Sequence, residues 1–246
     1  MKKLFALCLL SMNLFAGDFV VGTTSGYAPF VSLDTQGKYE GFDIDLAELL
    51  AQKLGKKLVL KDLGSMPSLM LALKQRKIDA LIWAVSITED RLKNIDMVYY
   101  QGDKMVEIPV LFWKKIPEGI TSIADLSKDP KKAICAEAGS FQEDVLKKFS
   151  GINIKNVDKI TDAIMEIKFG KSFATTVDPS LLPRFQAQYP EIKVLNLPLP
   201  ASAQSLGNGI GINKSNQELT QQVKKAIDEL ISEGKIAELE KKWKLK

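Results

Sequence analysis

The sequence predicts an α/β fold in which helices cover one or more β-sheets. From residue 19 onward, short apolar runs alternate with amphipathic helical patterns, an order that is typical of layered α/β folds. The alternation occurs in two sets, near 19–103 and near 112–195, and extended stretches lie near 102–110 and 196–206. The two sets suggest two lobes, but the spacing alone also permits a single doubly wound sheet.

The first set of elements follows from hydrophobic periodicity. Leu46, Leu50 and Leu54 recur on one face, so we expect a helix that begins at Asp43. In chain order, the pattern predicts a strand at 20–21, a helix at 43–54, a strand at 58–60, a helix at 67–75, a buried strand at 80–85, a helical turn capped by Thr88, and a long strand at 105–113.

The second set contains clear helix starts. Ser140 and Ser215 are each followed three residues later by Glu, which is the spacing of a capping box, and Pro179 stands at a favoured first helical position. In chain order, the pattern predicts a strand at 132–136, a helix at 140–149, a short strand at 154, a helix at 161–169, a strand at 173–177, a helix from 178, an extended stretch at 193–200, a strand at 207–213, and helices at 215–233 and 236–243.

Residues 1–16 have the pattern of a signal peptide. Lys2 and Lys3 precede an apolar run that is shorter than the roughly 20 residues a membrane span needs, and Ala16 stands before the expected cleavage point. We therefore expect export to the periplasm, with a retained N-terminal anchor as the alternative. No later segment is long and apolar enough to span a bilayer.

Composition excludes several classes of function. Without the two lysines of residues 1–16, the 34 Lys and Arg fall to 32 against 30 Asp and Glu, and the charges are interspersed, which argues against nucleic-acid binding. The chain has no histidine, which removes Ser-His and Cys-His nucleophiles and His-containing zinc sites. We expect no catalytic residue, no metal and no cofactor.

Arg91 and Asp178 are the charged residues best placed to hold a ligand. Arg91 lies one turn into the helix that Thr88 caps, where a carboxylate would meet free N–H groups and a guanidinium, with Ser86 as a further donor. The alternative is a surface pair with Glu89 or another nearby acid. Asp178 ends a predicted strand, and it is either a simple helix cap or a group that faces a ligand.

Several segments together resemble the periplasmic amino-acid-binding proteins that serve ABC importers. They are GTTSGYAPF (22–30), GFDIDLAELLAQKLG (41–55), SITEDR (86–91), MEIKFGKS (165–172) and EGKIAELEKKWKL (233–245), and the likeness is greatest to arginine-binding members of the chlamydial kind. The resemblance implies a two-lobed periplasmic binding protein fold of type II, with each lobe a sheet flanked by helices and a two-strand hinge between them. It implies lobes of 17–103 plus 207–246 and of 104–206. It also implies a monomer that captures a free amino acid, arginine in the first place, and delivers it to an inner-membrane ABC permease.

The resemblance further assigns roles in the site. Arg91 corresponds to the residue that binds the ligand α-carboxylate, and Asp178 to the acid that receives the α-ammonium group. Ser86 and the lobe-two segment Ser140–Phe141 would complete the carboxylate site, although family members usually have a small hydroxyl residue at the position of Phe141.

The side-chain pocket departs from the family pattern. Tyr27 matches the aromatic residue that stacks on the ligand, but Met66 stands where a second aromatic is common. Trp83 and Ala84 replace a small residue and a Gly or Ser. Trp83 either packs in the core of the first lobe or enters the pocket, where its face could attract a cation.

Two positions bear on the charge that would select a basic side chain. Thr24 stands where several members with basic ligands have Asp or another polar residue, and Glu137 is either a counter-charge in the pocket or a solvated loop acid. The fold also resembles that of cyclohexadienyl dehydratases, which need an acid in the cleft, and Glu137 is the candidate for that role. An enzyme of that kind and an amino-acid sensor or adhesin are the competing functions.

Overall fold

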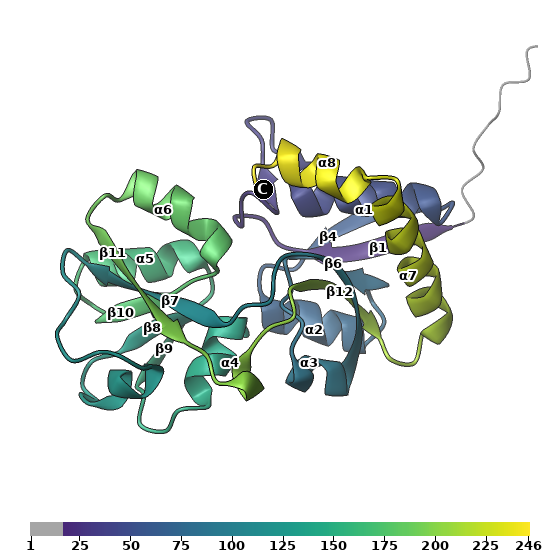
Figure 1. Cartoon of the computed structure of the whole chain (residues 1–246). Coiled ribbons are helices and arrows are strands. Elements are labelled where there is room, and N and C mark those ends of the chain that lie inside the picture. The colour runs from purple at the N-terminus through teal and green to yellow at the C-terminus, as the bar shows by residue number, and fades with distance from the viewer. Residues whose placement is uncertain (1–16) are drawn as a thin grey trace, which may run out of the picture.

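The computed structural model describes residues 17–246 and contains two separate five-stranded sheets, so the single doubly wound sheet is excluded. The predicted signal peptide, 1–16, lies outside the described residues. The sheets form two lobes joined by two connecting segments (Figure 1).

The first sheet is mixed and gathers strands from both ends of the described chain. Its order is β4 (Lys57–Asp62), β1 (Asp18–Thr23), β5 (Ala80–Leu81), β12 (Asn208–Asn213) and β6 (Ile95–Gln101). β1 is parallel to β4 and β5, and β12 is antiparallel to β5 and β6. The late strand β12 therefore returns to the first lobe, between two early strands.

The second sheet is built wholly from the middle of the chain. Its order is β11 (Ile192–Pro198), β7 (Glu107–Trp113), β10 (Ala174–Thr176), β8 (Ile134–Glu137) and β9 (Ile154–Val157). β8 is parallel to β9 and β10, whereas β7 is antiparallel to β10 and β11. A small hairpin of β2 (Ser32–Leu33) and β3 (Tyr39–Glu40) lies outside both sheets.

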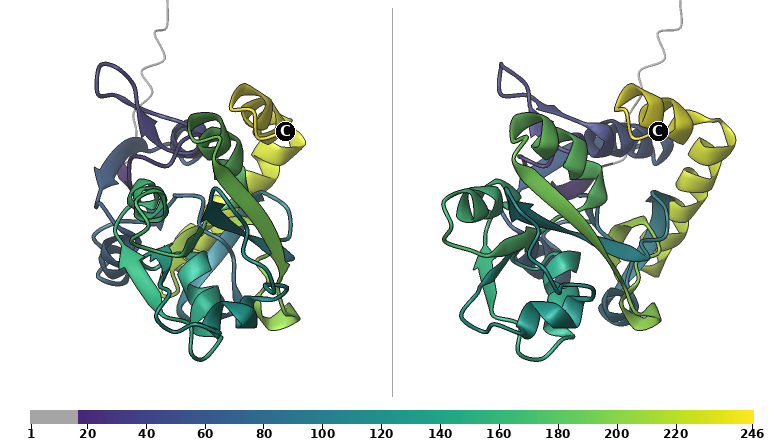
Figure 2. Two further views of the ribbon diagram at one scale, coloured as in Figure 1. Left: turned by 90° about the vertical axis from the view of Figure 1, so that its left-hand side faces the viewer. Right: turned by 60° about the vertical axis from the view of Figure 1, so that its left-hand side comes forward.

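The helices divide between the lobes in the same way. The first lobe carries α1 (Phe42–Lys53), α2 (Met66–Lys74), α3 (Glu89–Asn94), α7 (Gln217–Ser232) and α8 (Lys235–Lys242), and the second carries α4 (Phe141–Lys147), α5 (Ile160–Lys168), α6 (Leu182–Gln188) and the 3₁₀ turns η1 (Ile123–Ser127), η2 (Pro179–Leu181) and η3 (Ala201–Ala203). The C-terminal helices α7 and α8 pack on α1, as the turned views of Figure 2 show. No helix within residues 17–246 is both long and apolar enough to cross a membrane.

The two connecting segments are hydrogen-bonded to each other. The N–H of Met105 donates to the carbonyl of Ser205 at 3.0 Å, and the N–H of Leu199 donates to the carbonyl of Val106 at 2.8 Å. This pairing forms the two-stranded connection between the lobes, and its action as a hinge stays a prediction. The exact limits of the lobes, 17–103 with 207–246 and 104–206, stay a prediction.

Some details differ from the sequence prediction. The buried strand expected at 80–85 ends at Leu81, and the chain then turns. Asn216, not Ser215, caps α7, since its side chain accepts from the N–H of Leu219. Strand β6 and the β2–β3 hairpin had no predicted counterpart.

Candidate functional site

A cavity lined by residues of both lobes lies where the two lobes meet. All the residues that the sequence predicted to bind ligand line it, with the exception of Thr24: Tyr27, Met66, Trp83, Ala84, Ser86, Arg91, Glu137, Ser140, Phe141 and Asp178. Val85, Ala138 and Gln142 line it as well and were not predicted.

The backbone turn that forms the lobe-one wall of the cavity is held by Asp43, a buried residue that does not itself line the cavity. Asp43, 1% exposed in the first turn of α1, accepts the N–H of Ala84 at 2.7 Å and the hydroxyl of Tyr100 at 2.8 Å. Ala84 has φ +44°, an unusual backbone angle for a residue with a side chain. The bond that the N–H of Ala84 donates to Asp43 therefore holds the turn that ends β5 early and that presents Trp83 and Ser86 to the cavity.

Burial also controls the charge of Asp43. Loss of hydration raises the pKa of this carboxyl to about 7, although the bonds from Tyr100 and Ala84 act in the opposite direction.

Arg91 reaches from the first lobe to the second. Thr88 caps α3 as predicted, accepting the N–H of Arg91. The guanidinium donates through Nη1 to the carbonyl of Ser86 at 2.9 Å and through Nη2 to the carbonyl of Gly139 at 3.0 Å. Its ion pair is with Asp144 of α4, at 3.7 Å, and not with the neighbouring acid Glu89.

Burial also shifts the pKa of Arg91. Desolvation lowers the pKa of the guanidinium, and the carboxylate of Asp144 opposes that shift. Further N–H donors of the guanidinium remain for a ligand carboxylate.

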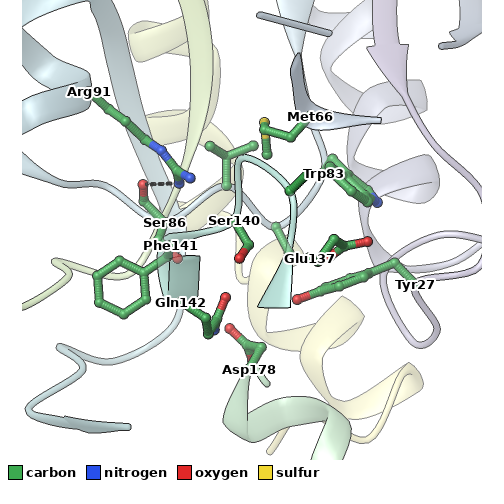
Figure 3. Close-up of a pocket in the computed structure, with 13 residues that line it drawn as sticks. Tyr27, Met66, Trp83, Ser86, Arg91, Glu137, Ser140, Phe141, Gln142 and Asp178 are labelled. Carbon is green, nitrogen blue, oxygen red and sulfur yellow. Dashed lines mark hydrogen bonds between the residues drawn. The ribbon is translucent and has the colours of Figure 1, made fainter. Parts of the chain in front are cut away.

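Asp178 faces the cavity from the second lobe. Its Oδ1 accepts the N–H and the hydroxyl of Ser180, so it does cap η2. Oδ2 has no hydrogen-bond partner in the described part of the chain, and Figure 3 shows the carboxyl group directed toward Gln142. Burial raises the pKa of Asp178, and the bonds from Ser180 lower it. The cap thus uses Oδ1 and leaves Oδ2 available to a ligand.

Tyr27, Trp83 and Glu137 form the end of the cavity away from Arg91 (Figure 3). The rings of Tyr27 and Trp83 have centroids 5.4 Å apart at an angle of 60°. Trp83 therefore enters the pocket while it also packs against the lobe-one core. Glu137 is 8% exposed, and burial raises its pKa to about 7 against a hydrogen bond from the N–H of Ile160. The solvated-loop alternative for Glu137 is wrong.

The lobe-two segment 139–141, at the start of α4, lies at the edge of the cavity. Ser140 caps α4 by accepting the N–H of Glu143 at 3.1 Å. The Glu143 carboxylate in turn accepts the N–H of Gly139 and not that of Ser140, so the predicted capping box is altered. The ring of Phe141 belongs to the lobe-two core. Gly139 approaches Met66 of the first lobe so closely that a Cβ built on it would lie 3.1 Å from the Met66 side chain.

Thr24 is the one predicted residue that the cavity does not include. It is buried, and its hydroxyl donates to Oδ1 of Asp62 at 2.7 Å. Gln142 was missed because a glutamine in the first turn of a helix is an ordinary surface residue. The only signal for it was its place two residues after the predicted cap, Ser140.

Residues 17–246 contain no group of three or more His, Cys, Asp or Glu side chains that could hold a metal ion. Among the described residues, Arg91 is the only cationic side chain that lines the cavity, and Glu137 and Asp178 are the acidic ones. Such a site can bind a small zwitterion by charge pairing at both ends.

Comparison with known proteins decides the family. The model of the bacterial extracellular solute-binding proteins, family 3, matches residues 19–246. The chain belongs to this family. The family 3 fold accounts for the two lobes and for the position of the cavity between them.

Individual relatives and solved structures are similar to the chain over most of its length. The probable ABC transporter arginine-binding protein ArtJ of Chlamydia trachomatis is 34% identical over 92% of this chain and 86% of its own. A solved ancestral arginine-binding protein bound to arginine is 30% identical, covers 93% of this chain and 99% of its own, and has a TM-score of 0.78. An ancestral amino-acid-binding protein described as a precursor of cyclohexadienyl dehydratase is 26% identical over 92% and 95%, with a TM-score of 0.76.

Proposed function

We propose that this chain is a periplasmic binding protein that captures an amino acid, arginine in the first place, and delivers it to an ABC permease in the inner membrane. The observation that carries the proposal is one cavity in which Arg91 of one lobe and Asp178 of the other face the same space. Membership of family 3 and the likeness to ArtJ support transport rather than catalysis.

Both ends of an amino acid would be bound by opposite lobes. The α-carboxylate would take the spare donors of Arg91, and the α-ammonium group would meet the free Oδ2 of Asp178. Because these contacts form together only when the lobes are closed, the ligand would stabilise the closed form. Tyr27 would stack on the ligand side chain.

The connecting segments would act as the hinge for this closure. Met105 and Ser205 pair across them, and each sheet lies wholly on one side. We keep 17–103 with 207–246 and 104–206 as the moving bodies. We expect a monomer, since one cavity formed by one chain is complete in itself.

Calorimetry of the purified mature protein against all twenty amino acids tests the proposal. We expect arginine to bind and to raise the melting temperature. Binding of glutamine or another neutral ligand without a response to arginine or lysine would reject arginine as the ligand but keep amino-acid capture. No response to any amino acid would reject the function.

Glu137 keeps one enzymatic alternative open. A buried carboxyl whose pKa is raised to about 7 can act as a general acid, and one solved relative is described as a precursor of a dehydratase. Turnover of prephenate or arogenate by the purified protein would establish that alternative. The pairing of Arg91 with Asp178 across the cavity favours a zwitterion over a dianion, so we expect no turnover.

A further inference from the structure

We infer that Glu137 is the residue that selects a cationic ligand side chain, by supplying the carboxylate for its charged end at the aromatic side of the cavity. This inference rests on the proposed function and specifies the class of side chain that the same site accepts.

The charge balance of the cavity points to such a ligand. Arg91 and Asp178 match the two charges of an amino-acid backbone, and Glu137 is then the one charged lining residue left without a counterpart. No salt bridge or side-chain hydrogen bond to Glu137 occurs within residues 17–246 except the bond from the N–H of Ile160. Burying an unpaired carboxylate is costly, so a second cationic group on the ligand would be the compensating partner.

The position of Glu137 agrees with that role. It ends β8 in the second lobe, and Figure 3 shows its carboxyl group on the same side of the cavity as Tyr27 and Trp83, away from Arg91. A ligand held by its backbone at Arg91 and Asp178 would extend its side chain toward that side. The two aromatic faces, with centroids 5.4 Å apart, would add cation–π attraction to the same charged end.

Thr24 cannot supply this charge. Its hydroxyl is occupied by Asp62, and neither residue lines the cavity. Asp62 is itself held by Thr24, by the hydroxyl of Tyr39 and by the N–H groups of Ser25 and Gly64. The selecting acid therefore comes from the second lobe.

Protons should distinguish a cationic ligand from a neutral one. In the closed form, burial raises the pKa of Glu137 to about 7, so a complex with a neutral ligand side chain carries a proton there in part at neutral pH. A cationic side chain favours the ionised form, so its complex should hold fewer protons at Glu137. The preference for a cationic ligand over a neutral one should accordingly fall as pH drops below about 7.

Other ionisable groups near Glu137 are shared by every amino-acid ligand. Asp178 has a raised pKa, Tyr27 has a pKa well above its usual 10.0, Arg91 has a lowered one, and the buried Asp43 acts on Tyr27. Comparing arginine with citrulline removes the contribution of these groups to proton uptake and to pH dependence. Citrulline has the same backbone and almost the same shape as arginine but a neutral side chain.

The test measures arginine and citrulline binding by calorimetry in wild type, in Glu137→Gln, and in Glu118→Gln, which removes an exposed acid of the same lobe. Glu137→Gln removes one partner of a buried charge pair, so it should reduce the preference for arginine over citrulline by about 100-fold. The smallest reduction that we expect is about tenfold. Citrulline affinity should stay within about threefold, which also shows that the variant is folded. Glu118→Gln should behave as wild type.

A second measurement needs no variant. At pH 7, arginine binding to wild type in two buffers of different ionisation enthalpy should release about half a proton more than citrulline binding. If arginine binds but Glu137→Gln keeps its preference over citrulline, or no extra proton is released, the inference is wrong and amino-acid capture stands. If wild type prefers citrulline, the inference is also wrong. If no amino acid binds, the proposed function itself fails.

Discussion

The contact between Gly139 and the first lobe makes closure of the cleft testable with a single methyl group. Gly139 has φ +72°, and a Cβ built on it would lie 3.1 Å from Cβ and Cγ of Met66 and 3.2 Å from Cδ of Pro67. Both neighbours begin α2 on the opposite lobe. Gly139→Ala should therefore oppose the closed form and weaken arginine binding.

The size of the effect follows from the separations. Contacts of this length are relieved by movements of a few tenths of an ångström, so the low end of the overpacking range, about 1 kcal/mol, applies. That energy corresponds to roughly a fivefold higher Kd for arginine. A side chain at positive φ costs a further 1–2 kcal/mol or so, but this cost acts on the open and closed forms alike.

Gly170→Ala is the matched control for the backbone cost. Gly170 lies in the same lobe with φ +66°, and a Cβ there would meet nothing within 4 Å. Both variants should lower the melting temperature by about 2–8 °C, whereas only Gly139→Ala should change the Kd measured by calorimetry. Wild-type affinity in Gly139→Ala, or an equal loss in Gly170→Ala, would refute the closed contact.

Three further variants probe other features of the site. Asp178→Asn keeps an oxygen for the cap but loses the charge, so arginine affinity measured by calorimetry should fall by about 100-fold or more, and an unchanged Kd would rule out the ammonium assignment. Since folding raises the pKa of Asp43 from 3.8 to about 7, its stabilising contribution is full below pH 4 and is lost as pH rises to 7. Asp43→Asn should flatten that decline in urea titrations of the ligand-free protein, and an unchanged slope would contradict it. Lys148 pairs with Asp90 across the lobes at 2.9 Å, but the pair is exposed, so Lys148→Gln should change the arginine Kd by less than about fivefold and only at low salt; a larger loss would give this pair a main role in closure.

The parts of the fold that could be predicted from sequence are those decided by local chemistry. The leucine periodicity of 43–54 predicts α1 within one residue at each end, and the Thr88 cap fixes the start of α3. The strand order could not be derived from spacing, because the return of β12 to the first sheet is a long-range pairing that leaves no local pattern. The family resemblance supplied that step.

In the candidate site too, features set by local sequence could be predicted and features set by long-range contacts could not. The places of Arg91 and Asp178 at helix starts could be predicted because a helix start has its own sequence signature, whereas their ligand roles came from the family resemblance and stay a prediction. The early end of β5 could not be found. It depends on the bond between Asp43 and Ala84, residues 41 positions apart, which overrides the strand preference of the apolar run at 80–85. Gln142 has no such signature, since only the approach of the other lobe turns it from a surface residue into a lining one.

Closure and charge selection are connected through Arg91. Its guanidinium donates to the carbonyl of Ser86 in one lobe and of Gly139 in the other, so the residue proposed to receive the ligand carboxylate also joins the closed lobes. Asp178 and Glu137 are both buried in the closed form, and the one lining cation cannot balance two ionised acids. A ligand with one carboxylate and two cationic groups would restore the balance. Under the proposed function, a basic amino acid would therefore favour the closed form most, and selectivity would arise from the cost of closing around any other ligand.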